Sequence, residues 1–407
     1  MASSPAQNVR GAPPWLLTIL LLLALSGAGY YVWWSLIRTP TTLKADAVAV
    51  EAPRGGFNGR PSAPPLPEGK DPGPTLLTLQ LTNISPESAF QQLAKAGGLE
   101  ILRSSSLWDQ IEKKTVSLSL KDQSFWPAFF DLCLQSGVCF EAGYNEAPRA
   151  SRNSVQLQPD PSGRMRCPVV FSGSFAVILR QIRHTATADY AAQNPPRHDL
   201  TLDVMLLAEP KIPVLEISYT PDIQTAVDDA GNSLVPAAPR YRGYGGPPGN
   251  WHNNLQINLT YPPKPAKRIA RLAATARVVT ASIQPLEIAN VLTARDVASN
   301  IEGMQIVFKG LSKTGNGYNA ALAISGPSDR RSMRFLTRGS MLRLMDAQGR
   351  EYSHSGNDSS GSPDGFTFNA QFSARGGIGQ PAKLVLSVPN KLQEITVPFT
   401  FMDLPMP

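Results

Sequence analysis

The chain has 407 residues, of which 42% are hydrophobic, 17% charged and 8% aromatic, and it contains 37 prolines and 32 glycines. This length is too great for one ordinary domain, and the low charge with the high proline content argues against a coiled coil or helical bundle and favours many short strands. The formal net charge of +7, from 38 Lys and Arg against 31 Asp and Glu, is weak for a protein that binds nucleic acid, so we expect no nucleic-acid partner.

An uncharged apolar segment stands near the start of the chain. Residues 11–37 contain no charged side chain, and residues 15–37 are long enough to cross roughly 30 Å of hydrocarbon once as a helix. Aromatic side chains mark both ends of this segment, where amphipathic rings favour the headgroup level. The sequence therefore predicts a transmembrane helix at 15–37, with five aromatic membrane anchors: Trp15, Tyr30, Tyr31, Trp33 and Trp34.

A cleaved signal peptide is the alternative interpretation, because small residues at 26–28 would suit a cleavage site. The apolar run continues beyond residue 28, which favours a retained anchor. The short tail at 1–14 is expected to stay in the cytoplasm, so we expect residues 39–407 on the other side of the membrane.

Residues 39–74 contain eight prolines and no apolar run that would build a core. Proline fixes φ and favours extended conformations, so this segment is predicted to be a semi-rigid linker.

A repeat with an offset of 39 residues occupies 75–160. Alternating leucines in each copy predict a strand with one buried face, and an apolar stripe predicts a helix after it. Ser85 and Ser124 are expected to cap the helix starts, and Gly98 and Gly137 the helix ends. The predicted order is β-α-β-β-α-β-β.

This pattern resembles the short N-terminal domain of secretins and TonB-dependent receptors. The resemblance implies a bacterial envelope protein, so the localisation we expect is the inner membrane, crossed once, with the bulk of the chain in the periplasm. It also implies a domain that docks partner proteins without catalysis. A generic two-layer α/β module with the same hydrophobic pattern is the alternative.

Three cysteines are present, Cys133, Cys139 and Cys167, so an exported chain can form one disulfide and leave one thiol. Cys139 and Cys167 are the better pair if a bridge exists, and the pairing stays open. The histidines form no metal-ligand cluster with these cysteines, so we expect neither a metal nor a cofactor.

Residues 166–407 are dominated by alternating apolar and polar residues, which is typical of half-buried antiparallel strands. Two turns share the pattern D-x-x-G, at 228–231 and 346–349. They suggest two β-sandwich-like modules, at 166–281 and 282–407. The Ala-rich stretch 268–279 is ambiguous between a strand and a helix.

Catalytic motifs such as a nucleophile elbow, a phosphate-binding loop or a paired-histidine zinc motif are absent from the sequence. We therefore expect no enzyme and no catalytic residue. An envelope hydrolase with a site built from distant residues such as His184, His198 and His252 is a minor alternative. A basic cluster is a candidate interaction patch, although it also suits an ordinary solvated face: Arg330, Arg331, Arg334, Arg338 and Arg343.

The expected fold class is α+β and all-β: an N-terminal transmembrane helix, a small α/β domain and antiparallel β-sandwich-like modules. The expected function is a membrane-anchored, non-catalytic interaction or scaffold protein with a protein partner in the envelope. An accessory component of a secretion, pilus or envelope signalling machine is the alternative.

Overall fold

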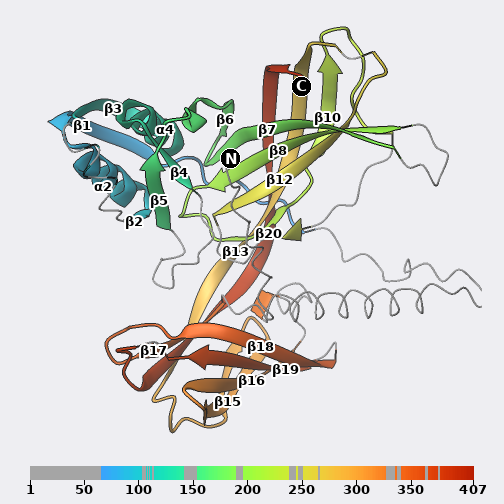
Figure 1. Ribbon diagram of the computed structural model, residues 1–407. Helices are drawn as coiled ribbons and strands as arrows, with labels where there is room; N and C mark the ends of the chain where they lie inside the picture. Colours follow the sequence, from blue (N-terminus) through green and yellow to red (C-terminus); the bar gives the residue numbers. More distant parts are fainter. Residues whose placement is uncertain are drawn as a thin grey trace, which may run out of the picture. The chain divides into compact units, whose positions relative to one another are not determined.

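Figure 1 shows a computed structural model of the chain, which describes most of residues 66–407. The described stretches are 66–102, 114–141, 154–188, 196–237, 244–245, 251–264, 266–326, 335–336, 341–362, 365–374 and 376–407, with Leu107, Asp109 and Ile111. Residues 64–407 form one compact unit.

Residues 76–159 fold into a small α/β layer whose element order is the expected one. Both helices end at a glycine in the left-handed region, Gly98 at φ 73° and Gly137 at φ 69°, as predicted. Ser85 caps the first helix by accepting from the backbone N–H of Ser88, whereas the Ser124 side chain makes no such bond. The elements are β1 (Leu76–Ile84), α2 (Pro86–Gly97), β2 (Glu100–Leu102), β3 (Val116–Ser124), α4 (Phe125–Ser136), β4 (Val138–Glu141) and β5 (Ser154–Pro159).

The strands of this layer form two small sheets. β1 pairs antiparallel with β3, and β5 lies between β2 and β4, parallel to the first and antiparallel to the second. Phe90 and Phe129, one from each helix, are fully buried and meet edge to face. Their packing closes the core between the helices and the strands.

A four-stranded antiparallel sheet, called the first sheet here, follows in the order β12-β8-β7-β6. Residues 175–179 are five consecutive buried apolar residues, because both faces of this sheet are covered. Its inner face packs on the central sheet, and part of its outer face joins the core of the α/β layer. The strands are β6 (Val169–Ser172), β7 (Phe175–Thr187), β8 (Arg197–Ala208) and β12 (His252–Thr260).

The central sheet is built on two very long antiparallel strands, β13 (Arg268–Ala289) and β20 (Pro381–Pro405). Their pairing runs from Arg268 opposite Pro405 to Ala289 opposite Lys383. The order is β11-β9-β13-β20-β17, and β10 also pairs with β13. The shorter strands are β9 (Val214–Ser218), β10 (Asp222–Asp228), β11 (Tyr244–Gly245) and β17 (Leu342–Asp346).

One half of the β13–β20 ribbon packs against the first sheet (Figure 1). The other half packs against a further, five-stranded sheet, called the third sheet because it follows the first and central sheets. The two hydrophobic cores meet at Val278 and Val279, which are neighbours in β13 but belong to different cores. The third sheet has the order β14-β15-β16-β19-β18. Its strands are β14 (Val297–Ile301), β15 (Met304–Thr314), β16 (Gly317–Ser325), β18 (Ser353–Ser362) and β19 (Gly365–Ser373).

The expected fold class is wrong. Strands make up 63% of the described chain and helices 12%, so it is a mostly β protein with a β-sandwich-like arrangement of sheets. The predicted boundary between residues 281 and 282 falls inside β13, and a shared ribbon replaces two separate modules. Within the described residues no helix is both long and apolar enough to cross a membrane, and the segment 15–37 lies outside them.

The two D-x-x-G turns have the same geometry, as their shared pattern predicted. In each, the aspartate accepts backbone N–H bonds from the residues two and four positions further on, at 2.7–3.0 Å. The glycines, Gly231 and Gly349, adopt φ values of 83° and 77°. Each turn follows a strand that pairs with the long ribbon, β10 on β13 and β17 on β20.

Candidate docking groove

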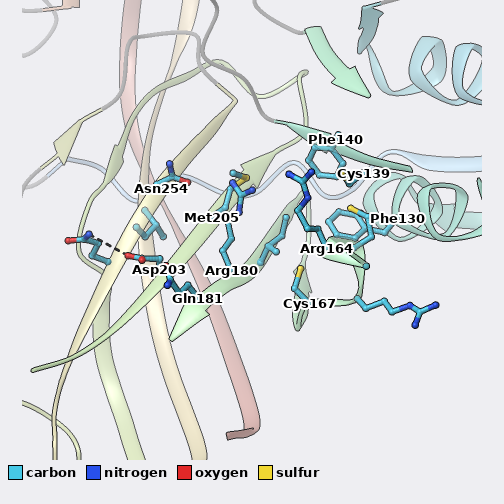
Figure 2. A pocket seen from close by; sticks show the side chains of 16 residues that line it. Phe130, Cys139, Phe140, Arg164, Cys167, Arg180, Gln181, Asp203, Met205 and Asn254 are labelled. Carbon is cyan, nitrogen blue, oxygen red and sulfur yellow. Dashed lines mark hydrogen bonds between the residues drawn. The ribbon is translucent and has the colours of Figure 1, made fainter. Parts of the chain in front are cut away.

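A groove lies where the outer face of the first sheet leaves the cover of the α/β layer (Figure 2). Its volume is about 910 Å³. One side comes from β7, β8 and β12, and the other from α4, β4 and a short 3-10 helix, η1 (Arg164–Arg166). The lining consists of Phe130, Cys139, Phe140, Gly163, Arg164, Met165, Arg166, Cys167, Ile178, Arg180, Gln181, Asp203, Met205, Asn254, Leu255 and Gln256.

The floor of the groove is made of two rows of facing residues that cross the strands of the first sheet. Directly facing residues on adjacent strands share one face of a sheet. In the order β7, β8 and β12, the rows are Ile178–Met205–Asn254 and Gln181–Asp203–Gln256. Ile178 and Met205 of the first row belong to the apolar core, whereas Asn254 at its end and the whole second row are polar and more open to solvent.

Arg180 lies between these rows in a β-bulge. Leu179 faces Val204 and Gln181 faces Asp203, so β7 holds one residue more than β8 at this point. Bulges change the direction of side chains next to them. Leu179 points into the sandwich core, and Arg180 and Gln181 both line the groove.

The opposite wall is fixed by a turn that carries Arg164 and Arg166. Asp160 accepts the backbone N–H of Arg164 at 2.7 Å and that of Met165 at 2.9 Å, and the Met165 side chain is buried. Burial alone would raise the pKa of Asp160, but these bonds and the nearby Arg164 charge lower it below its usual value. The turn therefore presents the two arginines on either side of an anchored methionine.

A tryptophan pair holds the α/β layer against the first sheet. Trp126 of α4 is 1% exposed and donates its Nε1–H to the carbonyl oxygen of Ser174 at 3.2 Å. Its ring stacks on Trp251, with centroids 5.8 Å apart and planes inclined by 23°. Buried aromatic pairs with a satisfied N–H make a specific contact, so this joint sets the position of the groove wall.

Two carboxylates extend the joint to the segment that precedes β1. Glu209 is fully buried, accepts the Thr75 backbone N–H at 3.0 Å on each oxygen, and lies 3.2 Å from Lys211. Asp71 accepts the backbone N–H and the hydroxyl of Ser174 at 3.0 and 2.7 Å. The end of the predicted linker and the residue that follows it are thus hydrogen-bonded to Ser174 and Glu209 beside the tryptophan pair.

The groove carries an excess of positive charge. Its charged lining residues are three arginines and Asp203. Asp203 already lies 3.5 Å from Arg183 and accepts the Gln256 amide at 3.4 Å. Arg166 and Arg180 form no ion pair with any residue in the described part of the chain. Figure 2 shows the Arg164 and Arg180 side chains extending from η1 and β7.

The three cysteines are free thiols in this structure. Cys139 and Cys167 both line the groove. Burial raises the pKa of the Cys167 thiol, and the Arg180 charge offsets part of that rise; burial also raises the pKa of Cys133. The structure thus contains no bridge between 139 and 167, and a pairing of these two stays a prediction.

Two of the three histidines named as a possible catalytic set lie together. His184 Nε2 is 3.0 Å from His198 Nδ1, and the Tyr261 ring stacks on His184. His252 packs against Trp251 instead. His252 faces Leu207 of β8 while His184 faces Leu200, a separation of roughly 20 Å at about 3.3 Å per residue. No group of three or more metal-ligating side chains occurs in the described stretches.

The predicted interaction patch lies largely outside the described residues, which include Arg343 but not Arg330, Arg331, Arg334 or Arg338. Arg343 pairs with Glu351 at 3.0 Å. The five aromatic anchors at 15–34 also lie outside the described residues.

The groove residues were missed by reasoning from the sequence. Residues 175–179 are apolar without alternation, which indicates a strand covered on both faces and hence a second layer on the sheet. Arg180 interrupts that run, and Arg164 and Arg166 follow a D-P-S-G turn. The sequence thus contains the apolar run, the arginine that interrupts it and the turn. It does not show that the turn lies opposite β7, because that contact depends on the tertiary fold.

Comparisons with protein-family models, with characterised proteins and with solved structures found no match to this chain.

Proposed function

We propose that this chain is a non-catalytic interaction protein of the bacterial cell envelope and that the groove is its docking surface. The observation that carries the proposal is the composition of the groove: a buried apolar centre beside arginines, on a frame fixed by the Trp126 joint. Protein interfaces share this anatomy, with an apolar core and enriched aromatic and arginine residues. A frame fixed in advance lowers the cost of binding.

Membrane attachment is part of the proposal. The apolar sequence at 15–37, with its aromatic ends, supports a chain held at the inner membrane with residues 39–407 in the periplasm. Attachment would raise the local concentration of the docking surface. A reporter that is active only outside the cytoplasm, fused after Pro407, should be active; activity of a cytoplasm-specific reporter at that position would refute this topology.

Photo-crosslinking in living cells tests the docking surface directly. A photoreactive phenylalanine analogue is placed at Gln181, which lines the groove, and in a control chain at Lys313, an exposed position on the third sheet. We expect a discrete protein adduct from position 181 and none from position 313. Equal adducts from both positions, or none from position 181 or from Asn254 on β12, a second lining position, would reject the groove as a docking surface.

An accessory role in a secretion, pilus or envelope signalling machine is the second candidate. The order β-α-β-β-α-β-β, with β2 parallel to β5, supports it through the resemblance to the short N-terminal domain of secretins and TonB-dependent receptors. Mass spectrometry of the adduct from position 181 separates the two candidate functions. If the crosslinked protein is an outer-membrane pore or its assembly partner, the accessory role is favoured; if it is an unrelated envelope protein, the accessory role is contradicted.

A further inference from the structure

We propose that the groove binds an extended protein segment that combines acidic and apolar side chains. The inference rests on the docking function proposed above and names the chemistry of the partner. Three observations support it: the charge of the lining, the position of the apolar centre, and the β-bulge that adds the polar Gln181 to the same face.

Charge complementarity favours an acidic partner. Arg166 and Arg180 line the groove and form no ion pair in the described part of the chain. The one acidic lining residue, Asp203, already has Arg183 and Gln256 as neighbours. A carboxylate on the partner would meet guanidinium groups that donate two parallel hydrogen bonds. A basic partner would meet like charge at the same place.

The apolar centre of the groove lies beside Arg180. Ile178 precedes Arg180 by two residues in β7, and it faces Met205 across the strand pair. Phe130 and Phe140 contact each other edge to face and line the opposite wall. An apolar side chain of the partner would therefore bind beside its carboxylate, which is the arrangement of side chains two residues apart on one face of an extended segment.

The bulge adds a further polar side chain to this face of β7. Without the extra residue, Ile178 and Arg180 would still share the groove face, because they are two residues apart, but Gln181 would point into the sandwich core. The register shift lets both Arg180 and Gln181 line the groove directly after the buried Leu179. The same strand thus supplies part of the apolar floor and its charged edge.

Binding of synthetic peptides to the full-length chain, purified in a zwitterionic detergent, tests the inference. The probe, called the Glu-Leu peptide, has about ten residues in the repeat Glu-Ser-Leu-Ser and carries an uncharged dye, so that Glu and Leu share one face of an extended chain. Gln-Leu and Lys-Leu peptides, with Gln or Lys in place of Glu, are the comparisons. We expect the Glu-Leu peptide to bind roughly tenfold more tightly than the Gln-Leu peptide, and the advantage to shrink with added salt. Equal affinities, or preference for the Lys-Leu peptide, would overturn it.

Matched arginine variants locate the binding. Arg180→Gln should weaken the Glu-Leu peptide by roughly three- to tenfold, and Arg180→Lys less, because the charge remains. Arg271→Gln at an exposed position of β13 removes the same charge outside the groove lining and should leave affinity unchanged. Thermal melting confirms that the exposed substitutions leave the fold intact. No change with Arg180→Gln, or the same loss with Arg271→Gln, would contradict the assignment.

A lipid surface is the competing outcome. If vesicles with anionic headgroups bind through Arg180 and the Glu-Leu peptide does not, the partner is a membrane and the inference fails. If the cellular adduct at position 181 forms but no peptide preference appears, the groove remains a docking surface and only its acidic partner is rejected.

Discussion

Asp346 is a buried carboxylate that organises the turn between β17 and β18. It accepts backbone N–H bonds from Gln348, Arg350 and Gly379, and its Oδ2 lies 2.7 Å from Arg350 Nε. Burial alone would raise its pKa, but the bond from Gly379 and those from Arg350 and Gln348 outweigh that effect and lower the pKa to about 2. Asp228 has the same role in the corresponding turn on β10, with a lowered pKa.

The stability that this carboxylate contributes should depend on pH. An ordinary Asp titrates near pH 3.9 when unfolded, and the folded pKa is lower, so the contribution is complete above about pH 4 and is lost as pH falls toward about 2. Asp346→Asn should lower Tm by a few degrees at pH 6, and the difference from the parent chain should narrow as melting is repeated toward pH 3.

Asp296→Asn is the control, because that side chain is 69% exposed and pairs only with Lys309 in the described structure. Its effect on Tm should be small. A loss for Asp346→Asn that is independent of pH would contradict the ionised-carboxylate account.

The β13–β20 ribbon is the element that sets the architecture. Its pairing register shifts between Thr280 and Ser282, and the partner strand accommodates the shift with Lys391, whose φ is 49°. The bulge lies beside the point where the ribbon leaves one core for the other. Bulges bend and twist strands, which suits a ribbon that serves two sandwiches.

Lys391→Gly should therefore stabilise the protein by up to about 1 kcal/mol, since glycine adopts positive φ without a Cβ clash. Thr396→Gly, at an exposed and regular position of β20, should destabilise by roughly the same amount, because glycine weakens a strand interior. Both changes in stability are measured as shifts of the urea unfolding midpoint, with the slope of the transition unchanged. A loss of stability with Lys391→Gly would show that the bulge does not strain this residue.

The sequence predicts local elements far better than their partners. The caps at Ser85, Gly98 and Gly137 and the two D-x-x-G turns depend on neighbouring residues, and these predictions were confirmed. The stretch 268–279 was ambiguous because its Ala-rich sequence suits either a helix or a strand, and its pairing with β20 makes it a strand. The groove was not predictable, because its two walls are separate in sequence and their contact is a tertiary property.

At the scale of the molecule, a shared ribbon couples the two cores. Each long strand contributes buried residues to both of them, so the loss of one core removes packing from the strands that support the other. We expect one cooperative urea transition. Hydrogen exchange of β8 and β12 reports on the first half, and that of β15 and β16 reports on the second. Two transitions with clearly separated midpoints would mean that the halves unfold as independent domains.

The claim that the groove is occupied by a partner in the cell is tested most directly by arginine footprinting. Native membranes and the purified chain are treated with a dicarbonyl reagent, and the modified peptides are quantified by mass spectrometry. The account predicts that Arg180 and Arg166 react less in native membranes than in the purified chain, while Arg295, which binds carbonyl oxygens on the other half of the chain, reacts equally in both. Equal reactivity of Arg180 in the two preparations would contradict it.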